Sequence, residues 1–201
     1  MRHTVGAVTV NSNHDMRPIF LVGYMGSGKS TLGRALGDAT GLQFIDLDTY
    51  IERRFHANIR DIFAERGEEG FRDIERRMVR EVCEFEDVIV ACGGGTPCFF
   101  DNMDVMNASG TTVFLRASTE KLHERLKLGR RRRPLIAAMN DDELLDYIMT
   151  ALEKRMPHYG KASCEFCADY LDDAAMIRRS VREFAKRFGL PMKDGNVPDA
   201  K

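Results

Sequence analysis

"GYMGSGKST", residues 23–31, matches the phosphate-loop pattern G-x-x-x-x-G-K-[ST] at every fixed position. The loop follows "RPIFLVG" (17–23), a short apolar run that suits a buried parallel strand. It also opens "GKSTLGRALGDATG" (28–41), which is typical of a helix ended by a glycine. Because a chance match would lack this context, the sequence predicts a strand–loop–helix unit that holds a nucleoside triphosphate.

Each part of this loop has an expected role. Its glycines let backbone N–H groups point at phosphate oxygens, and the helix N-terminus adds its positive end. Lys29 is expected to reach the β- and γ-phosphates, and the Ser30 hydroxyl to ligate Mg²⁺. We therefore predict that ATP contacts the run Gly26, Ser27, Gly28, Lys29, Ser30 and Thr31.

Outward from the loop, predicted strands alternate with predicted helices. Further strands are expected over 42–48, 87–92 and 111–117, and a fifth over "CADYLDD" (167–173). This alternation predicts an α/β fold, in which helices cover both faces of a parallel sheet. Ligands in such sheets gather at the carboxyl ends of the strands.

Length and patterning indicate one domain. We expect a flexible leader over 1–16, a single domain over 17–188 and a flexible tail over 189–201. The basic stretch "GRRRRPLIAAMND" breaks the helical pattern, and we interpret residues 129–141 as a mobile lid.

Composition excludes several classes of partner. Lys and Arg number 30 and Asp and Glu number 31, so no broad attraction to nucleic acid or to a membrane surface is expected. The sequence has no apolar run of about 20 residues and no signal peptide, which favours a cytoplasmic protein. Five cysteines argue against a disulfide framework. We interpret Cys164 and Cys167 as reduced thiols at the start of a strand rather than as zinc ligands.

Two carboxylates end the second predicted strand. Strand alternation would place Asp46 and Asp48 on one face. Neighbouring carboxylates repel each other unless a cation or a hydroxyl donor lies near. One can hold the Mg²⁺ shell through water, and the other can accept the proton of an attacking hydroxyl. Helix capping is the alternative.

Three further motifs are candidates for an acceptor site. Arg72 and Glu75 are spaced to pair on a helix, and from spacing alone a surface ion pair is the better interpretation. Alternatively, Glu75 orients Arg72 toward a substrate carboxylate. The glycines of "ACGGGTP" (91–97) allow a ligand to lie against the backbone, and the basic lid can supply an arginine that neutralises transition-state charge.

Together these segments resemble the shikimate kinases. The matching stretches, in order, are "GYMGSGKSTLGRAL", "FIDLDTYIE", "IRDIFAERGEEGFRDIE", "CGGGTP", "RPLI" and "EKRMPHY". The resemblance implies the nucleoside-monophosphate-kinase-like fold, with a five-stranded parallel sheet in the order 2-3-1-4-5 and a mobile lid. It also implies transfer of the ATP γ-phosphoryl to the 3-hydroxyl of shikimate by a monomer, with Mg²⁺ and without nucleic acid or membrane.

The resemblance also implies residue roles. Asp46 would bind Mg²⁺ through water beside Ser30, and Asp48 would bind substrate hydroxyls and act as the base, with Lys29 and Arg133 as further catalytic residues. The predicted substrate-binding residues are Asp48, Arg72, Gly94, Gly95 and Arg155, with Phe63 and Phe71 lining the pocket. Arg133 would meet the phosphates, and Arg130 is our candidate for stacking on adenine. A proline-containing adenine loop is replaced here by "DDAAM" (172–176).

Two other functions remain open from the residues. One is a kinase for another small hydroxy acid, which the same site chemistry would serve. The other is a nucleotide-dependent switch that binds ATP without turnover. Asp48, Arg72 and Arg155 together speak against a switch, because a switch does not need an acid-binding pocket.

Overall fold

The computed structural model describes residues 16–130 and 133–193. Within this part, five parallel strands form one sheet in the order β2-β3-β1-β4-β5, which confirms the predicted order. The strands are β1 (Ile19–Val22), β2 (Gln43–Asp46), β3 (Val88–Ala91), β4 (Thr111–Arg116) and β5 (Cys164–Cys167).

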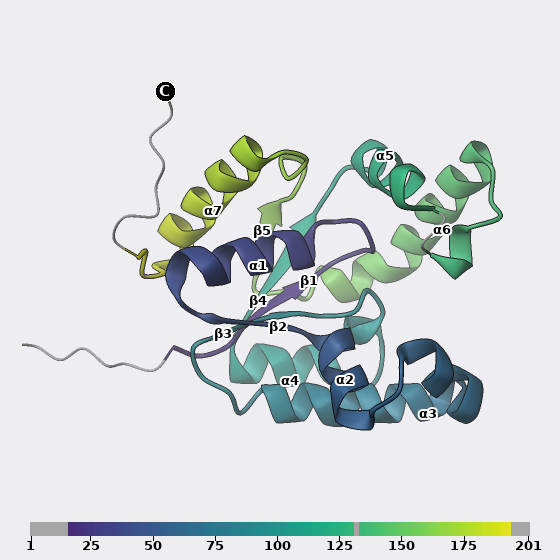
Figure 1. Ribbon diagram of the computed structural model, residues 1–201, viewed down its shortest axis with the longest axis horizontal. Helices are drawn as coiled ribbons and strands as arrows, with labels where there is room; N and C mark the ends of the chain where they lie inside the picture. The colour runs from purple at the N-terminus through teal and green to yellow at the C-terminus, as the bar shows by residue number, and fades with distance from the viewer. Residues whose placement is uncertain (1–15, 131–132, 194–201) are drawn as a thin grey trace, which may run out of the picture.

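Helices cover both faces of this sheet (Figure 1). On one face lie α1 (Lys29–Thr40) and α7 (Ala174–Phe188), and on the other α2 (Leu47–Phe55), α3 (Ile59–Val82) and α4 (Asn102–Ser109). Helices α5 (Thr119–Gly129) and α6 (Asp141–Tyr159) lie together at one end, and short 3₁₀ turns occupy η1 (Thr96–Cys98) and η3 (Pro134–Ile136). Among the described residues, no helix combines the length and apolarity needed to cross a membrane.

Strand β1 explains why the sheet needs two helical layers. All four of its residues are buried. Phe20 and Val22 pack into the core shared with α3 and α6, whereas Ile19 and Leu21 pack into the core shared with α1 and α7. Because successive side chains of a strand point to opposite faces, a continuous apolar run requires cover on both sides.

The chain segments that enter and leave this domain lie at the amino ends of the strands. Met16 N donates to Asp87 Oδ1 (3.0 Å), just before β3. Lys193 N donates to the Ala39 carbonyl (2.9 Å), at the last turn of α1. The phosphate loop lies at the opposite end of α1, so the described chain ends are far from it (Figure 1).

The prediction of the fifth strand over 167–173 is wrong. The strand is Cys164–Cys167, paired with β4 from Val113 to Arg116, and the predicted segment is the loop that follows it. Only Phe166 of β5 is fully buried, so this edge strand lacks an apolar run. Cys164 and Cys167 are accordingly the first and last residues of the strand rather than its start.

Other boundaries also differ from expectation. The second strand ends at Asp46, and Asp48 lies in the first turn of α2, so strand alternation does not relate the two carboxylates. Helix α6 is continuous through Pro157 to Tyr159, and no helix was predicted over 102–109, where α4 lies.

The predicted leader and tail lie mostly outside the described residues, which exclude 1–15, 131–132 and 194–201. Near the tail, Leu190 is buried against the core of α1 and α7. The lid boundaries of 129–141 stay a prediction, and in the structure α5 ends at Gly129 and α6 begins at Asp141.

Candidate active site

The phosphate loop opens onto a cavity of about 660 Å³. Gly28, at the N-terminus of α1, has φ 95°, a left-handed conformation that favours glycine. Most residues of the predicted ATP-binding run line this cavity, together with one arginine of the predicted lid. They are Gly26, Gly28, Lys29, Ser30, Thr31 and Arg133. Ser27 does not line it, and its buried hydroxyl has no hydrogen-bond partner among the described residues.

Lys29 is buried and is held by the loop itself. Its ammonium donates to the carbonyls of Gly23 (2.8 Å) and Tyr24 (2.9 Å). Burial lowers the pKa of Lys29 to about 8, which the charges of Asp48 and Asp46 partly oppose. A buried cation with only neutral acceptors is poised to gain from an arriving phosphate.

Asp46 accepts hydrogen bonds from both α1 and α2. The Ser30 hydroxyl donates to Asp46 Oδ2 (2.7 Å), and Thr49 N donates to Asp46 Oδ1 (3.3 Å), which caps α2. The capping alternative and the metal-site hypothesis are therefore compatible. A hydroxyl beside a carboxylate is an oxygen donor set that suits Mg²⁺, which commonly takes few protein ligands and completes its shell with water and phosphates. No three metal-binding side chains cluster anywhere in residues 16–130 and 133–193.

Asp48 lies in the first turn of α2, two residues after Asp46, and is exposed when the whole residue is considered. Protein atoms nevertheless limit its hydration, and this desolvation raises the pKa of Asp48 to about 6. The charges of Asp46 and Glu75 raise it further, and Lys29 opposes them. A carboxylate with this pKa is ionised at neutral pH and is still basic enough to accept a proton.

The three glycines after β3 bring the acceptor-side residues together. A side chain at Gly93 would lie 3.1 Å from Asp48 Oδ1, one at Gly94 would lie 3.3 Å from Arg155 Nη1, and one at Gly95 would lie 2.8 Å from Arg72 Nη2. The absence of side chains in this loop is what allows a base and two guanidinium groups from three helices to converge.

Arg72 and Glu75 form a buried pair rather than the surface pair that spacing favoured. Arg72 Nη1 donates to Glu75 Oε2 (2.8 Å), and the Glu75 side chain is only 1% exposed. The Arg72 guanidinium also lies 3.9 Å from the ring centroid of Phe99. Phe63 and Phe71, predicted to line the pocket, stack on each other with ring centroids 4.3 Å apart.

Arg155 is held by aromatic residues. Its guanidinium lies 5.4 Å from the ring centroid of Tyr24 and interacts with the Tyr159 hydroxyl. That hydroxyl donates to the Gly94 carbonyl (2.6 Å), while the Tyr159 ring stacks on Phe114. Burial raises the pKa of Tyr159 to about 12, so it remains a donor at neutral pH.

Arg130 is not brought into the cavity. Its guanidinium donates to the Met139 carbonyl (2.7 Å) and to Asp141 Oδ1 (3.0 Å), at the start of α6. The geometry therefore gives no support to the prediction that Arg130 stacks on adenine.

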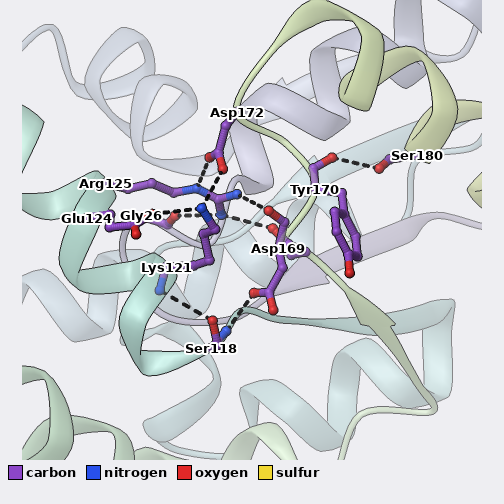
Figure 2. Close-up of polar contacts among 10 residues, drawn as sticks. Gly26, Ser118, Lys121, Glu124, Arg125, Asp169, Tyr170, Asp172 and Ser180 are labelled. Carbon is purple, nitrogen blue, oxygen red and sulfur yellow. Dashed lines mark hydrogen bonds and ion pairs between the residues drawn. The ribbon is translucent and has the colours of Figure 1, made fainter.

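Arg125 lines the cavity, although it was not among the residues predicted from the sequence. Figure 2 shows its polar contacts. Its guanidinium donates to Asp172 Oδ1 (2.6 Å) and to the carbonyls of Ala168 (2.9 Å) and Asp169 (3.1 Å). These bonds tie α5 to the loop after β5. Helical spacing contains a usable signal, because Lys121, Arg125 and Leu128 fall on one face of α5 and all three line the cavity.

Known proteins resemble this chain over most of its length. The family model described as shikimate kinase matches residues 25–186. Shikimate kinases from Bacteroides fragilis and Phocaeicola vulgatus are 52% and 53% identical over 172 residues, covering 86% of this chain and 96% and 98% of the relatives. The chain belongs to the shikimate kinase family. It is thus an ATP-dependent phosphotransferase of the shikimate pathway.

Solved shikimate kinases have the same fold. The crystal structure from Bacteroides thetaiotaomicron superimposes with a TM-score of 0.84 at 49% identity, covering 87% of this chain and 99% of that chain. The enzyme from Acinetobacter baumannii, solved in complex with shikimate, gives 0.72 at 29% identity, covering 87% and 94%. These similarities agree with the α/β architecture predicted from the alternation of strands and helices.

Proposed function

We propose that this chain phosphorylates the 3-hydroxyl of shikimate at the glycine loop after β3, using ATP held in the cavity of the phosphate loop. The observation that carries this proposal is the convergence of Asp48, Arg72 and Arg155 on three consecutive glycines. A base and two guanidinium groups fit a small acid that also carries a reactive hydroxyl. The shikimate bound to the Acinetobacter baumannii relative supports the same acceptor class.

The proposed chemistry is mostly positioning. Arg72 and Arg155 bind the acceptor carboxylate, with Gly94 and Gly95 as the floor beneath it. Asp48 accepts the proton of the 3-hydroxyl while the hydroxyl oxygen attacks the γ-phosphorus of ATP. The bond between the γ-phosphorus and the β,γ-bridging oxygen breaks, and ADP leaves. Lys29 and Arg133 stabilise the negative charge that spreads over the transferred phosphoryl group.

Ser30 and Asp46 are the proposed Mg²⁺ site. Their hydroxyl and carboxylate oxygens are 2.7 Å apart, next to the cavity in which the phosphates would lie. When bound, Mg²⁺ supplies positive charge that offsets the charge of the phosphates. Mg²⁺ thus stays a proposal, supported by this donor set.

For the adenine, we propose Arg125 in place of Arg130. The Arg125 side chain is 15% exposed and is fixed by three acceptors on the loop after β5. A planar guanidinium held in this way offers a rigid surface for a base to stack on. Leu128 and Leu171, which also line the cavity, provide apolar contact beside it.

We further expect a monomer located in the cytoplasm. All five cysteines are free thiols, as suits a reducing compartment. The dependence on ATP supports the same location. Analytical ultracentrifugation of the purified chain tests the monomer.

ADP release with shikimate and with gluconate as acceptors tests the proposed activity. We expect release that depends on shikimate and none that depends on gluconate. Absence of shikimate-dependent ADP release would contradict the proposal.

Arg72→Ala tests the acceptor site. Loss of one half of the carboxylate clamp is expected to raise KM for shikimate by about 10- to 100-fold, with little change in KM for ATP. Arg54→Ala is the matched control, because Arg54 is an exposed arginine in the last turn of α2 that pairs with Glu81. Equal weakening of both substrates by Arg72→Ala would indicate a structural role instead.

A further inference from the structure

Thr96 is a buried residue directly after the three glycines, and it has no part in the proposed phosphoryl transfer. Its side chain is fully enclosed, and its residue opens the 3₁₀ turn η1. Its backbone is fixed on both sides, because its N–H donates to the Gly93 carbonyl (3.1 Å) and its carbonyl accepts from Asn102 Nδ2 (3.0 Å). The hydroxyl of Thr96 is thus held in one place.

That hydroxyl is aimed at the buried carboxylate of Glu75. Thr96 Oγ1 donates to Glu75 Oε1 (2.5 Å), while Glu75 Oε2 accepts from Arg72 Nη1 (2.8 Å). A carboxylate that is 1% exposed needs hydrogen bonds on both oxygens, since burying an unpartnered charged group is costly. Thr96 satisfies one oxygen and thereby fixes the direction in which the other faces.

The orientation of Arg72 depends on that second oxygen. The Arg72 guanidinium carbon lies over the ring of Phe99, 3.9 Å from its centroid, and a contact with a ring face does not set the direction in which the N–H groups point. Glu68, the other carboxylate in contact, is exposed and lies 3.4 Å from Nη2. Within the described residues, Glu75 is therefore the buried anchor that sets how the guanidinium fork presents itself to the pocket.

We propose that Thr96 is a positioning residue for the acceptor carboxylate, acting through Glu75 on Arg72. The proposal rests on the proposed acceptor-binding role of Arg72. It places a hydroxyl from the glycine loop, a carboxylate from α3 and the acceptor-binding guanidinium in one buried hydrogen-bonded chain. Because Asn102 holds the Thr96 carbonyl, α4 supports this chain from behind.

Thr96→Val tests the proposal, since valine keeps the shape and removes the hydroxyl. We expect KM for shikimate to rise about tenfold, the loss typical of one hydrogen bond to a charged group, with KM for ATP changed less than about twofold. Thr96→Ser restores a hydroxyl and is expected to recover most of the affinity for shikimate. Thr40→Val, a buried threonine that donates to the Leu36 carbonyl at the far end of α1, is the matched control.

A second comparison separates positioning from general damage. In a Glu75→Gln background, Thr96→Val is expected to have little further effect on KM for shikimate, because the two groups act in one chain. Should the valine variant not fold, the pair Thr96→Ala and Thr96→Ser makes the same comparison.

An unchanged KM for shikimate in Thr96→Val would overturn the proposal, as would equal rises in both KM values that serine does not reverse. Failure of the proposed function has a different signature, namely a wild-type chain without shikimate-dependent ADP release.

Discussion

Asp48 is the base in the proposed mechanism, so its pKa is expected to set the pH dependence of the reaction. Its pKa is raised to about 6, mainly by desolvation and secondly by Asp46. Because only the ionised form accepts a proton, kcat/KM for shikimate is expected to fall about tenfold per pH unit below pH 6 and to level off above it. Initial rates between pH 4.5 and 8 test this. An acid limb near pH 4 would contradict it.

The same raised pKa has a consequence for stability. The folded chain holds a proton on Asp48 between about pH 4 and pH 6, where the unfolded chain has released it, so the ionised carboxylate costs stability above pH 6. Asp48→Asn is therefore expected to abolish transfer and yet to raise the free energy of unfolding at pH 7. Since Asp48 is exposed as a residue, solvent screening should limit the gain to at most about 1 kcal/mol. Urea titrations at pH 7 and pH 4 test this, with the gain vanishing at pH 4.

The sequence predicted which residues form the candidate site better than it predicted which residues surround them. The phosphate-loop residues follow from spacing, because backbone geometry requires those residue types at those positions. The burial of Glu75 could not be predicted from its spacing to Arg72, since its other hydrogen-bond partner, Thr96, is 21 positions away in sequence. Arg125 was missed for a similar reason, because its partners come from the loop after β5, more than 40 positions later.

The helical backbone of α3 is interrupted at Gly67. Gly67 has φ 68° and ψ −177°, a conformation essentially confined to glycine, while no atom within 4 Å would obstruct a side chain. Gly67→Asn is expected to lower the free energy of unfolding by about 1–3 kcal/mol through backbone strain. Chemical denaturation measures the loss.

Gly189 is the matched control for this prediction. It ends α7 with φ 64° and ψ 31°, and it too has no atom within 4 Å of an added side chain. This left-handed conformation is one that asparagine tolerates, so Gly189→Asn should cost less than about 1 kcal/mol. Equal losses at the two positions would show that backbone conformation is not what distinguishes them.

Elements were predictable where burial was strong. Strands β1 and β3 are wholly buried and appear in the sequence as apolar runs. Strand β5 lies at an edge with one fully buried residue, so the apolar residues after it, Ala168 and Leu171, drew the prediction too far along the chain. Those residues are buried for another reason: Leu171 packs at Gly28, against the phosphate loop.

In the molecule as a whole, the segment after α7 packs against α1 and α7, two helices that are far apart in sequence. Leu190 is 7% exposed in the core of α1 and α7, and Lys193 Nζ donates to the Asp38 carbonyl (3.1 Å). Leu190→Ala is expected to lower the free energy of unfolding by about 2–4 kcal/mol, as for other buried leucines. Leu135→Ala, at a leucine that is 71% exposed, should cost less than about 0.5 kcal/mol. Thermal denaturation of both variants tests the contrast.

The overall architecture followed from the alternation of strands and helices, and its strand order from the resemblance to a family. The sequence alone could not show how α5 and the loop after β5 meet beside the cavity at the phosphate loop, because that contact involves Lys121, Arg125 and Asp172 in a network of charges (Figure 2). Long charged side chains carry no periodic signal of their partners. Tertiary contacts of this kind are where sequence reasoning is weakest.

The placement of the described chain ends has a practical consequence. Met16 and Lys193 lie at the amino edge of the sheet, away from the phosphate loop (Figure 1). A chain coupled to a solid support at Met16 or Lys193 would therefore present the phosphate-loop edge of the sheet to the bulk solution. Attachment at these two positions thus suits immobilisation, because the support would lie away from the cavity at the phosphate loop.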